Sequence, residues 1–256
     1  MSVIELASGH AMPLLGLGTW QLRGDECTSV VQMALEMGYR HLDTAYNYKN
    51  QVEVALGLQA SGIERGEVFV TTKIWPDALQ YEQVHNQFAE CLEQLATDYV
   101  DLLLVHWPNK AVPLAETLKA FDEIAASGRA CSIGVSNFSP ALIDEAREVA
   151  SVPIVNNQIE LHVGNVDTAL LGHCRAHEVA VTAYRPLAKG GAADDMKLAA
   201  IGDKHGKSAA QVALRWLVQQ KIVAIPKASS EEHLRANMDI FDWTLDAEEM
   251  GRLHSL

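Results

Sequence analysis

The chain is poor in the residues that would mark several protein classes. Only 6% of its 256 residues are aromatic, and the cysteines Cys27, Cys91, Cys131 and Cys174 are scattered without metal-ligand spacing. We therefore expect reduced thiols and no cofactor metal. No apolar stretch approaches the roughly 20 residues of a membrane helix, and the first residues lack a signal-peptide pattern. These absences predict a cytoplasmic protein with no membrane partner.

Basic residues are also scarce, with 20 Lys and Arg against 33 Asp and Glu, for a formal net charge of -13. Such a surface repels phosphate backbones, which argues against nucleic acid as a partner but leaves room for a local anion site. Hydrophobic residues make up 48%, enough for a sizeable core. No repeat, low-complexity run or linker divides the sequence, so we predict a single domain over residues 1–256. We expect it to be a monomer, because no exposed apolar repeat is present.

Strand and helix signals alternate along the chain. A short hairpin is expected first, with arms at residues 3–6 and 12–13 around a Ser8-Gly9 turn. Eight predicted inner strands follow, at residues 14–19, 41–43, 68–73, 100–106, 131–135, 155–158, 179–184 and 222–225. Predicted helices occupy residues 26–37, 51–60, 81–95, 114–127, 140–149, 168–177, 196–205, 209–220, 231–238 and 247–253.

This alternation with short connections predicts an α/β fold, a (β/α)8 TIM barrel with a short N-terminal β-hairpin. The competing architecture is an open doubly wound sheet, which usually carries a GxGxxG sequence after its first strand. Here Gly16 and Gly18 lack a third glycine, and no helix opens at them. We interpret these glycines as sites of close packing within a strand.

Polar side chains suited to proton transfer stand at the ends of three successive predicted strands. Asp43 ends the second, Lys73 the third and His106 the fourth, while Tyr48 lies in the loop after Asp43. The carboxyl ends of parallel barrel strands meet at one mouth, where we expect these four groups to converge. A neighbouring ammonium would lower the pKa of the Tyr48 phenol and make it a usable general acid. His106 could orient a carbonyl oxygen.

Each of these residues also has a purely structural interpretation. Asp43 could cap a helix, Lys73 could be a solvated strand end, and His106 could be a satisfied core histidine. Lys73 could instead form a Schiff base, as in aldolases. That chemistry needs a neutral amine, whereas an adjacent Asp43 would keep the amine protonated. The combination on neighbouring strand ends favours the tyrosine acid.

Long motifs in the chain resemble those of the aldo-keto reductase family. The family's Gly-x-Arg-x-x-Asp-Thr-Ala sequence appears at residues 38–45, and a second signature resembles residues 95–108, ending His106-Trp107-Pro108. The likeness runs from the first strand to the last barrel helix. It implies NADPH-dependent reduction of aldehydes or ketones, with the family's catalytic tetrad at Asp43, Tyr48, Lys73 and His106.

The same resemblance implies cofactor-binding positions. Ser136, Asn137 and Gln158 match groups that hold the nicotinamide carboxamide, and Tyr184 matches the aromatic on which that ring stacks. Further matched positions are Thr19, Trp20, Asp43, Arg185, Pro186, Leu187, Lys227, Ala228, Ser229, Ser230, His233 and Asn237. We leave two interpretations of Arg185 open, contact with a cofactor phosphate or solvation.

The adenosine-phosphate loop departs from the family pattern. Lys227 matches, but His233 replaces the usual arginine, Ala228 the usual serine and Ala236 the usual glutamate. Histidine cannot reproduce the two-pronged phosphate contact of an arginine. We therefore expect NADPH as cofactor, with NADH as a weaker alternative.

The resemblance also implies a substrate pocket walled by Trp20, Trp75 and Trp107 next to Tyr48 and His106. The short chain end after Leu253 implies an open site for small polar carbonyl compounds. The likeness is strongest to bacterial reductases of 2,5-diketo-D-gluconate and methylglyoxal. Alternative functions are a non-catalytic NADPH-binding regulatory subunit and a Schiff-base lyase that uses Lys73.

Overall fold

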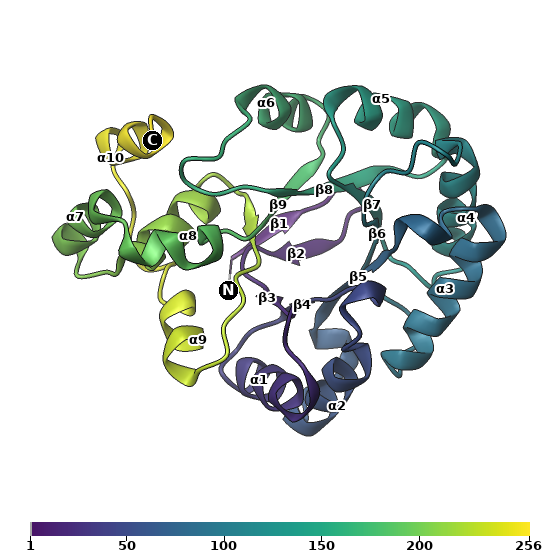
Figure 1. The fold of residues 1–256 in the computed structure, drawn as a ribbon, viewed down its shortest axis with the longest axis horizontal. Helices are drawn as coiled ribbons and strands as arrows, with labels where there is room; N and C mark the ends of the chain where they lie inside the picture. The colour runs from purple at the N-terminus through teal and green to yellow at the C-terminus, as the bar shows by residue number, and fades with distance from the viewer. Residues whose placement is uncertain (1) are drawn as a thin grey trace.

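Short apolar runs form the parallel strands of a barrel in the computed structural model, which describes residues 2–256. Each strand pairs with the next one along the chain, so that β3 and β10 are the two ends of the series. These strands are β3 (Leu17–Gly18), β4 (His41–Asp43), β5 (Phe69–Ile74), β6 (Leu102–Val105), β7 (Ile133–Ser136), β8 (Ile154–Glu160), β9 (Ala180–Tyr184) and β10 (Val223–Ala224). Figure 1 shows them at the centre of a ring of helices.

Backbone hydrogen bonds between the first and last strands close the barrel. Gly16 N donates to Ala224 O at 2.9 Å, and Ala224 N donates to Leu14 O at 2.9 Å. Gly18 N donates to Pro226 O at 3.1 Å. These bonds join the two ends of the strand series, as the predicted (β/α)8 fold requires.

The two glycines of the first strand allow this close approach. A Cβ atom on Gly16 would lie 2.5 Å from His41 Nδ1, and one on Gly18 would lie 2.6 Å from Ile225 O. Real side chains do not tolerate such distances. The interpretation of these glycines as close-packing positions is therefore confirmed.

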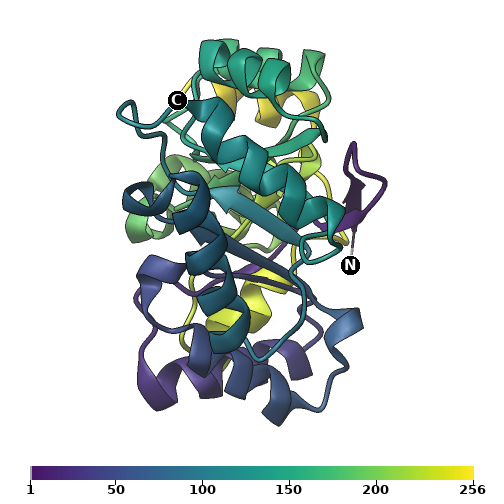
Figure 2. The same ribbon diagram turned by 90° about the vertical axis from the view of Figure 1, so that its right-hand side faces the viewer.

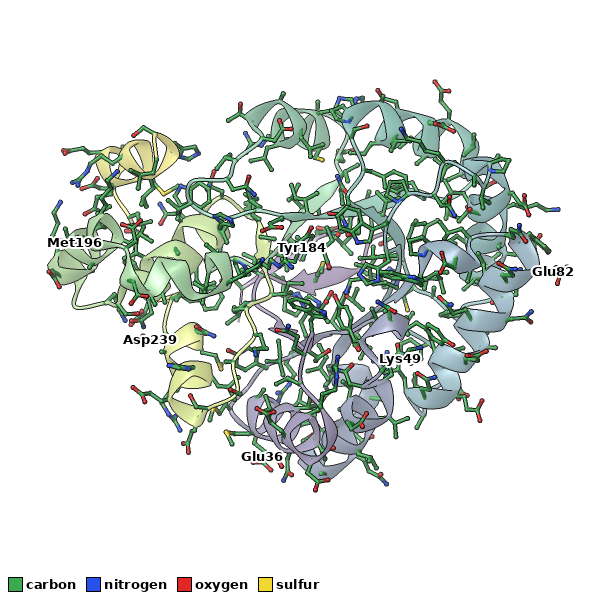
Figure 3. All side chains as sticks on the ribbon, in the orientation of Figure 1. Glu36, Lys49, Glu82, Tyr184, Met196 and Asp239 are labelled. Atoms are coloured by element: carbon green, nitrogen blue, oxygen red, sulfur yellow. The ribbon has the colours of Figure 1, made fainter. Side chains whose placement is uncertain are left out.

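Helices surround the barrel and bury its outer face. Figure 3 shows side chains filling the space between strands and helices, while the labelled Glu36, Glu82 and Asp239 project outward. The barrel helices are α1 (Gly24–Glu36), α2 (Gln51–Ser61), α3 (Tyr81–Gln94), α4 (Leu114–Ala126), α5 (Pro140–Val149), α6 (Thr168–Ala176), α8 (Ala209–Gln219) and α9 (Glu231–Met238). Two further helices, α7 (Met196–His205) and α10 (Ala247–His254), lie at one edge of the ring (Figure 1).

An antiparallel hairpin of β1 (Val3–Glu5) and β2 (Ala11–Pro13) precedes the barrel, as predicted. It projects from one side of the molecule in Figure 2. Ser8 Oγ lies 2.8 Å from Ser132 Oγ, directly before β7, so the hairpin packs at the amino-terminal ends of the strands. The carboxyl ends are therefore left open for a site.

The predicted element boundaries need several corrections. The first strand was expected over residues 14–19, but only Leu17–Gly18 forms β3. Three single-turn 3-10 helices were not predicted, because such short turns carry no hydrophobic period: η1 (Tyr46–Tyr48), η2 (Arg65–Glu67) and η3 (Pro76–Ala78). A longer 3-10 segment with a kink at Lys189 and Gly190, η4 (Ala188–Asp194), was also not predicted. The predicted helices 140–149 and 196–205 match α5 and α7 at both ends. Within residues 2–256, no helix is long and apolar enough to cross a membrane.

Candidate active site

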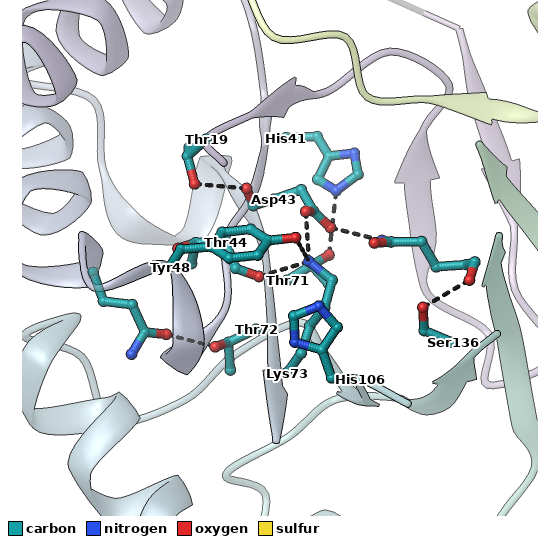
Figure 4. Close-up of polar contacts among 12 residues, drawn as sticks. Thr19, His41, Asp43, Thr44, Tyr48, Thr71, Thr72, Lys73, His106 and Ser136 are labelled. Atoms are coloured by element: carbon teal, nitrogen blue, oxygen red, sulfur yellow. Dashed lines mark hydrogen bonds and ion pairs between the residues drawn. The ribbon is translucent and has the colours of Figure 1, made fainter. Parts of the chain in front are cut away.

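Asp43 and Lys73 form a buried ion pair between the neighbouring strands β4 and β5. Lys73 Nζ lies 2.6 Å from Asp43 Oδ1, 2.8 Å from Thr44 O and 3.3 Å from Tyr48 Oη (Figure 4). The Lys73 side chain is fully buried. A lysine ammonium has three N–H donors, and here each one has an acceptor. The geometry therefore fits a protonated lysine.

The carboxylate of Asp43 is held on both oxygens. Gln158 Nε2 donates to Asp43 Oδ2 at 2.7 Å, while Lys73 occupies Oδ1. Burial raises the pKa of Asp43 and lowers that of Lys73, and the ion pair between them opposes both shifts. Because both oxygens accept hydrogen bonds and all three ammonium protons are donated, the arrangement is that of a charged pair. An ammonium in this state is not a Schiff-base nucleophile.

Tyr48 is the last residue of the turn η1, which is joined to β4 by a connection of two residues, Thr44 and Ala45. Its hydroxyl oxygen accepts from Lys73 Nζ, and its own proton has no acceptor within the described chain. The expected lowering of its pKa by Lys73 is wrong. Burial and the negative charge of Asp43 raise the pKa of Tyr48 well above its usual value, and only Arg185 acts to lower it. The charge of Lys73 is offset by its partner Asp43, so the phenol stays protonated.

His106 follows β6 and faces Tyr48 across the same mouth. Its ring meets the Tyr48 ring edge-on with centroids 5.6 Å apart, and the Trp75 ring at 5.1 Å. Burial, with a smaller effect of Lys73, lowers the pKa of His106 to about 3, so the imidazole is neutral. Its Nδ1 is buried without a partner, and an unpaired buried N–H is costly. We therefore assign the single proton to Nε2.

A hydrogen-bonded chain of amides and hydroxyls continues from the tetrad along β7 to β9. Ser136 Oγ donates to Gln158 O at 2.7 Å, and Asn137 Nδ2 donates to His106 O at 3.1 Å. Tyr184 Oη donates to Asn137 Oδ1 at 2.9 Å. The positions predicted to hold a nicotinamide therefore meet beside the tetrad. Their amide and phenol groups suit a flat ring that carries a carboxamide.

The predicted adenosine-phosphate loop lies between β10 and α9. Lys227, Ser229 and His233 are exposed, while Ala228 and Asn237 are buried. Among residues 2–256, Lys227 has no carboxylate within ion-pair distance, so its charge is available to an anion. Ser230 caps α9 by accepting the backbone N–H of His233 at 3.2 Å, as predicted. A lysine without a carboxylate partner, three residues before the N-cap of a helix, is a donor that fits a phosphate group.

Arg185, for which the sequence left phosphate contact and solvation open, has an ion-pair partner within the protein. Its Nη1 donates to Glu160 Oε2 at 2.9 Å. The guanidinium lies 5.2 Å from the centroid of the Trp20 ring and 5.8 Å from that of Tyr184. Arg185 also has a left-handed backbone with φ 50°, at the turn that leads into Pro186 and Leu187. It therefore joins the wall of the mouth.

The three predicted pocket tryptophans are placed around the tetrad. Trp20 and Trp107 are 41% and 44% exposed, which is unusual for so large an apolar side chain. Trp75 is half-buried against His106. Thr19, next to Trp20, donates its hydroxyl to Asp43 O at 2.9 Å. Exposed aromatic surface at the rim can cover a small organic substrate.

Two groups with a part in the site were not predicted. The carbonyl of Thr44 takes one of the Lys73 protons, and Glu160 fixes Arg185. A backbone acceptor leaves no signal in the sequence. Glu160 did leave a signal in the sequence, because it is a single acidic residue at the carboxyl end of β8 (Ile154–Glu160). Other predicted site residues also stand at the carboxyl ends of their strands.

Comparisons with known proteins are consistent across the whole chain. Residues 14–256 match the sequence model of the Aldo/keto reductase family. The chain is 37% identical over 254 residues to glyoxal reductase of Bacillus subtilis (strain 168), covering 99% of this chain and 92% of the relative. It is 36% identical over 258 residues to methylglyoxal reductase DkgA of Escherichia coli (strain K12), covering 100% and 93%. A solved structure assigned as a 2,5-diketo-D-gluconic acid reductase B superposes with a TM-score of 0.94 at 40% identity, over 98% of this chain and 89% of that one.

Proposed function

Because the chain belongs to the aldo/keto reductase family, we propose that it is an NADPH-dependent reductase of aldehyde and ketone groups in small polar molecules. Methylglyoxal and 2,5-diketo-D-gluconate are representative substrates. We infer that it acts as a monomer and as a single domain over residues 1–256.

One observation carries the proposal: a protonated phenol, a buried ammonium and a neutral imidazole share one mouth. Tyr48 Oη is 3.3 Å from Lys73 Nζ, and the Tyr48 and His106 rings are in edge contact. A carbonyl oxygen placed between Tyr48 and His106 Nε2 would accept two hydrogen bonds. Those bonds strengthen as negative charge develops on the oxygen, which is the requirement for catalysis.

In this proposal Tyr48 gives its proton to the carbonyl oxygen. The raised pKa of Tyr48 suits this role, because the proton is present at neutral pH and is released only to a strong base such as an alkoxide. The phenolate left behind would lie against Lys73 Nζ, which stabilises it. Asp43 is a positioning residue that holds the ammonium in place.

The donor set of the chain supports a dinucleotide as cofactor. The nicotinamide end would lie against Asn137, Gln158 and Tyr184, where amides and an aromatic ring are linked by hydrogen bonds. Lys227, exposed and without a carboxylate partner in the described part of the chain, would hold the 2′-phosphate. A bound NADPH supplies the hydride for the carbonyl carbon.

The substrate class follows from the rim. Exposed Trp20 and Trp107 offer flat apolar surface, while Arg185 brings a positive charge to within 5.2 Å of the Trp20 ring. This combination favours short, polar and acidic carbonyl compounds. Glyoxal and methylglyoxal, which appear in the names of two relatives, are short and polar like this class but carry no acid group.

The test is NADPH oxidation, followed at its absorbance, over a panel of aldehydes, ketones and keto acids. We expect turnover of methylglyoxal by the wild type and its loss by about 10²–10⁴-fold in Tyr48→Phe. NADPH should still bind to Tyr48→Phe, and its addition should still quench the tryptophan fluorescence of this variant. The matched control is Tyr46→Phe, whose hydroxyl instead contacts Glu90 at 2.7 Å and which should remain active. Full activity of Tyr48→Phe, or no oxidation with any substrate, would reject the assignment; the second result would favour a regulatory subunit.

A further inference from the structure

The helices α5 and α6 bring two histidines and an aspartate together on the outside of the barrel. His173 Nε2 lies 2.9 Å from Asp144 Oδ1, and His177 Nε2 lies 3.8 Å from the same oxygen. The two imidazole centroids are 4.5 Å apart. Figure 1 shows α5 and α6 as neighbours in the outer ring, away from the barrel mouth. The tetrad does not involve these residues.

We propose that Asp144, His173 and His177 form a binding site for a divalent transition-metal ion, with Zn²⁺ as the representative ion. His173 lies in the last turn of α6 and His177 is the C-cap residue that follows the helix, and their rings lie side by side with centroids 4.5 Å apart. Asp144 on α5 supplies the oxygen ligand. Two imidazoles, one carboxylate and an open position for water suit Zn²⁺, Cu²⁺ and Ni²⁺.

The spacing of the donor atoms supports the site. Zinc bonds to nitrogen and oxygen of about 2.0–2.1 Å place the ligands of a tetrahedral ion about 3.3 Å apart. The observed separations from Asp144 Oδ1, 2.9 Å to His173 Nε2 and 3.8 Å to His177 Nε2, lie on either side of that value. One ligand atom from each residue lies within 4.8 Å of the others. Shifts of less than 1 Å, roughly the scale of a side-chain adjustment, would therefore complete the coordination.

Charge and access also favour a cation. Within residues 2–256, no lysine or arginine is ion-paired with Asp144, so its negative charge is shared only with the two imidazoles. The side chains of His173, His177 and Asp144 are 21%, 33% and 48% exposed, which leaves a path for an ion to enter. Cys174 lies between the histidines in sequence but is buried, and burial raises the pKa of its thiol to about 11. The thiol is therefore not offered as a ligand.

A simpler role is a hydrogen-bonded pair that fastens α5 to α6. The chain offers a control histidine next to a carboxylate between two helices, because His85 Nε2 lies 3.4 Å from Glu123 Oε2, within ion-pair distance but without a hydrogen bond. That pair joins α3 to α4 with a single histidine. A His–carboxylate pair alone should not retain a metal ion, whereas the two-histidine cluster should.

The experiment is titration of tag-free protein with Zn²⁺ in competition with a chromophoric chelator. We expect one equivalent of tight binding to the wild type, weakened at least about 100-fold in His173→Gln and in His177→Gln and unchanged in His85→Gln. Wild type at a hundredfold excess of Zn²⁺ over Kd should melt roughly 5–10 °C higher, and the two ligand variants should not shift. With Co²⁺, the visible spectrum should show tetrahedral nitrogen and oxygen ligands without a thiolate charge-transfer band.

Several results would overturn the site. They are no Zn²⁺ binding by the wild type, the same loss of Zn²⁺ affinity in His85→Gln as in the other variants, and unchanged affinity in both His173→Gln and His177→Gln. A thiolate band in the Co²⁺ spectrum that vanishes in Cys174→Ser would also overturn it. Circular dichroism of each variant separates loss of a ligand from loss of the fold. The outcome is independent of carbonyl reduction, because the readouts are metal affinity, melting temperature and the Co²⁺ spectrum.

Discussion

Gln158 Nε2 donates a 2.7 Å hydrogen bond to Asp43 Oδ2, so a residue expected to hold the nicotinamide also orients the carboxylate that pairs with Lys73. In the proposed function, cofactor binding and proton transfer would thus share one side chain. The hydrogen bond also acts to lower the pKa of Asp43 against the effect of burial.

Replacement of Gln158 by methionine should therefore reduce kcat by about 10–100-fold, because a hydrogen bond to a charged group contributes about 1.5–3 kcal/mol. Affinity for NADPH, measured by tryptophan fluorescence, should fall as well. Gln51→Met is the matched control: Gln51 is equally buried but bonds to the Thr72 hydroxyl outside the tetrad. A variant with unaltered kcat would show that Asp43 needs no support from Gln158.

The pH dependence of reduction follows from the two pKa shifts at the mouth. Tyr48 must be protonated to act as acid, and its raised pKa moves deprotonation above its usual value near 10. His106 stays neutral above about pH 3. Stopped-flow measurement of kcat/KM should therefore show no ionisation of these groups between about pH 5 and about pH 9. A decline centred near neutral pH would indicate a phenol made acidic by Lys73.

The cofactor preference should respond to His233, which is exposed at the first turn of α9. His233→Arg would add a permanently charged fork next to Lys227, suited to a 2′-phosphate. We expect the ratio of kcat/KM for NADPH over NADH to rise about tenfold, equivalent to about 1.4 kcal/mol. His10→Arg adds the same charge on an exposed distant turn and should leave the ratio unchanged. If His233→Arg and His10→Arg had the same ratio of kcat/KM for NADPH over NADH, this loop would not be the binding site of the 2′-phosphate.

Acid should destabilise the fold through two buried histidines. Burial lowers the pKa of His41 and of His106 to about 3, below the unfolded value near 6.5. Below about pH 6.5 these histidines are protonated in the unfolded chain but stay neutral in the folded protein. Their contribution to the free energy of unfolding is therefore present at higher pH and is lost as the pH falls toward 3. Each contributes a slope of up to about 1.4 kcal/mol per pH unit in that window.

Urea unfolding at several pH values measures this slope. His41→Asn should make it about 1.4 kcal/mol per unit shallower between about pH 6 and about pH 4. His10→Asn at an exposed position should not. Identical slopes for all three proteins would mean that His41 is not buried in its neutral form.

Selectivity for acidic substrates should depend on Arg185. Because its guanidinium faces the Trp20 ring, Arg185→Met should raise KM for 2,5-diketo-D-gluconate about tenfold and change KM for uncharged methylglyoxal less than about twofold. Glu160→Gln removes the competing carboxylate and should lower KM for the acid. Parallel changes for both substrates would instead assign Arg185 to cofactor binding or to loop structure.

The fold was predictable because its signals are local and repeated. Apolar runs such as Leu102–Val105 and capped helices such as the one after Ser230 are visible without tertiary information. The short β3 was overestimated, because residues 14–16 pair with the far end of the chain through one isolated bridge, Leu15 with Ala224, which no local pattern encodes.

The placement of the four tetrad side chains was predictable from strand ends, but their electrostatics was not. The pKa of Tyr48 depends on burial and on how the charges of Asp43 and Lys73 offset each other. Both are visible only in the three-dimensional structure. The Arg185–Glu160 pair likewise depends on the neighbouring positions of β8 and β9. The cluster at Asp144 was missed for a similar reason, since its residues come from two helices.

Hydrogen bonds join Leu14, Gly16 and Gly18 with Ala224 and Pro226, and so link segments about two hundred positions apart. During synthesis, a ribosome must deliver the chain as far as Pro226 before this seam can form. Until then both outer strands of the growing sheet present unsatisfied backbone groups, the kind of surface that recruits chaperones or other nascent chains. Synthesis of β10 and Pro226 is therefore the step after which the two outer strands of the barrel can satisfy each other's backbone groups.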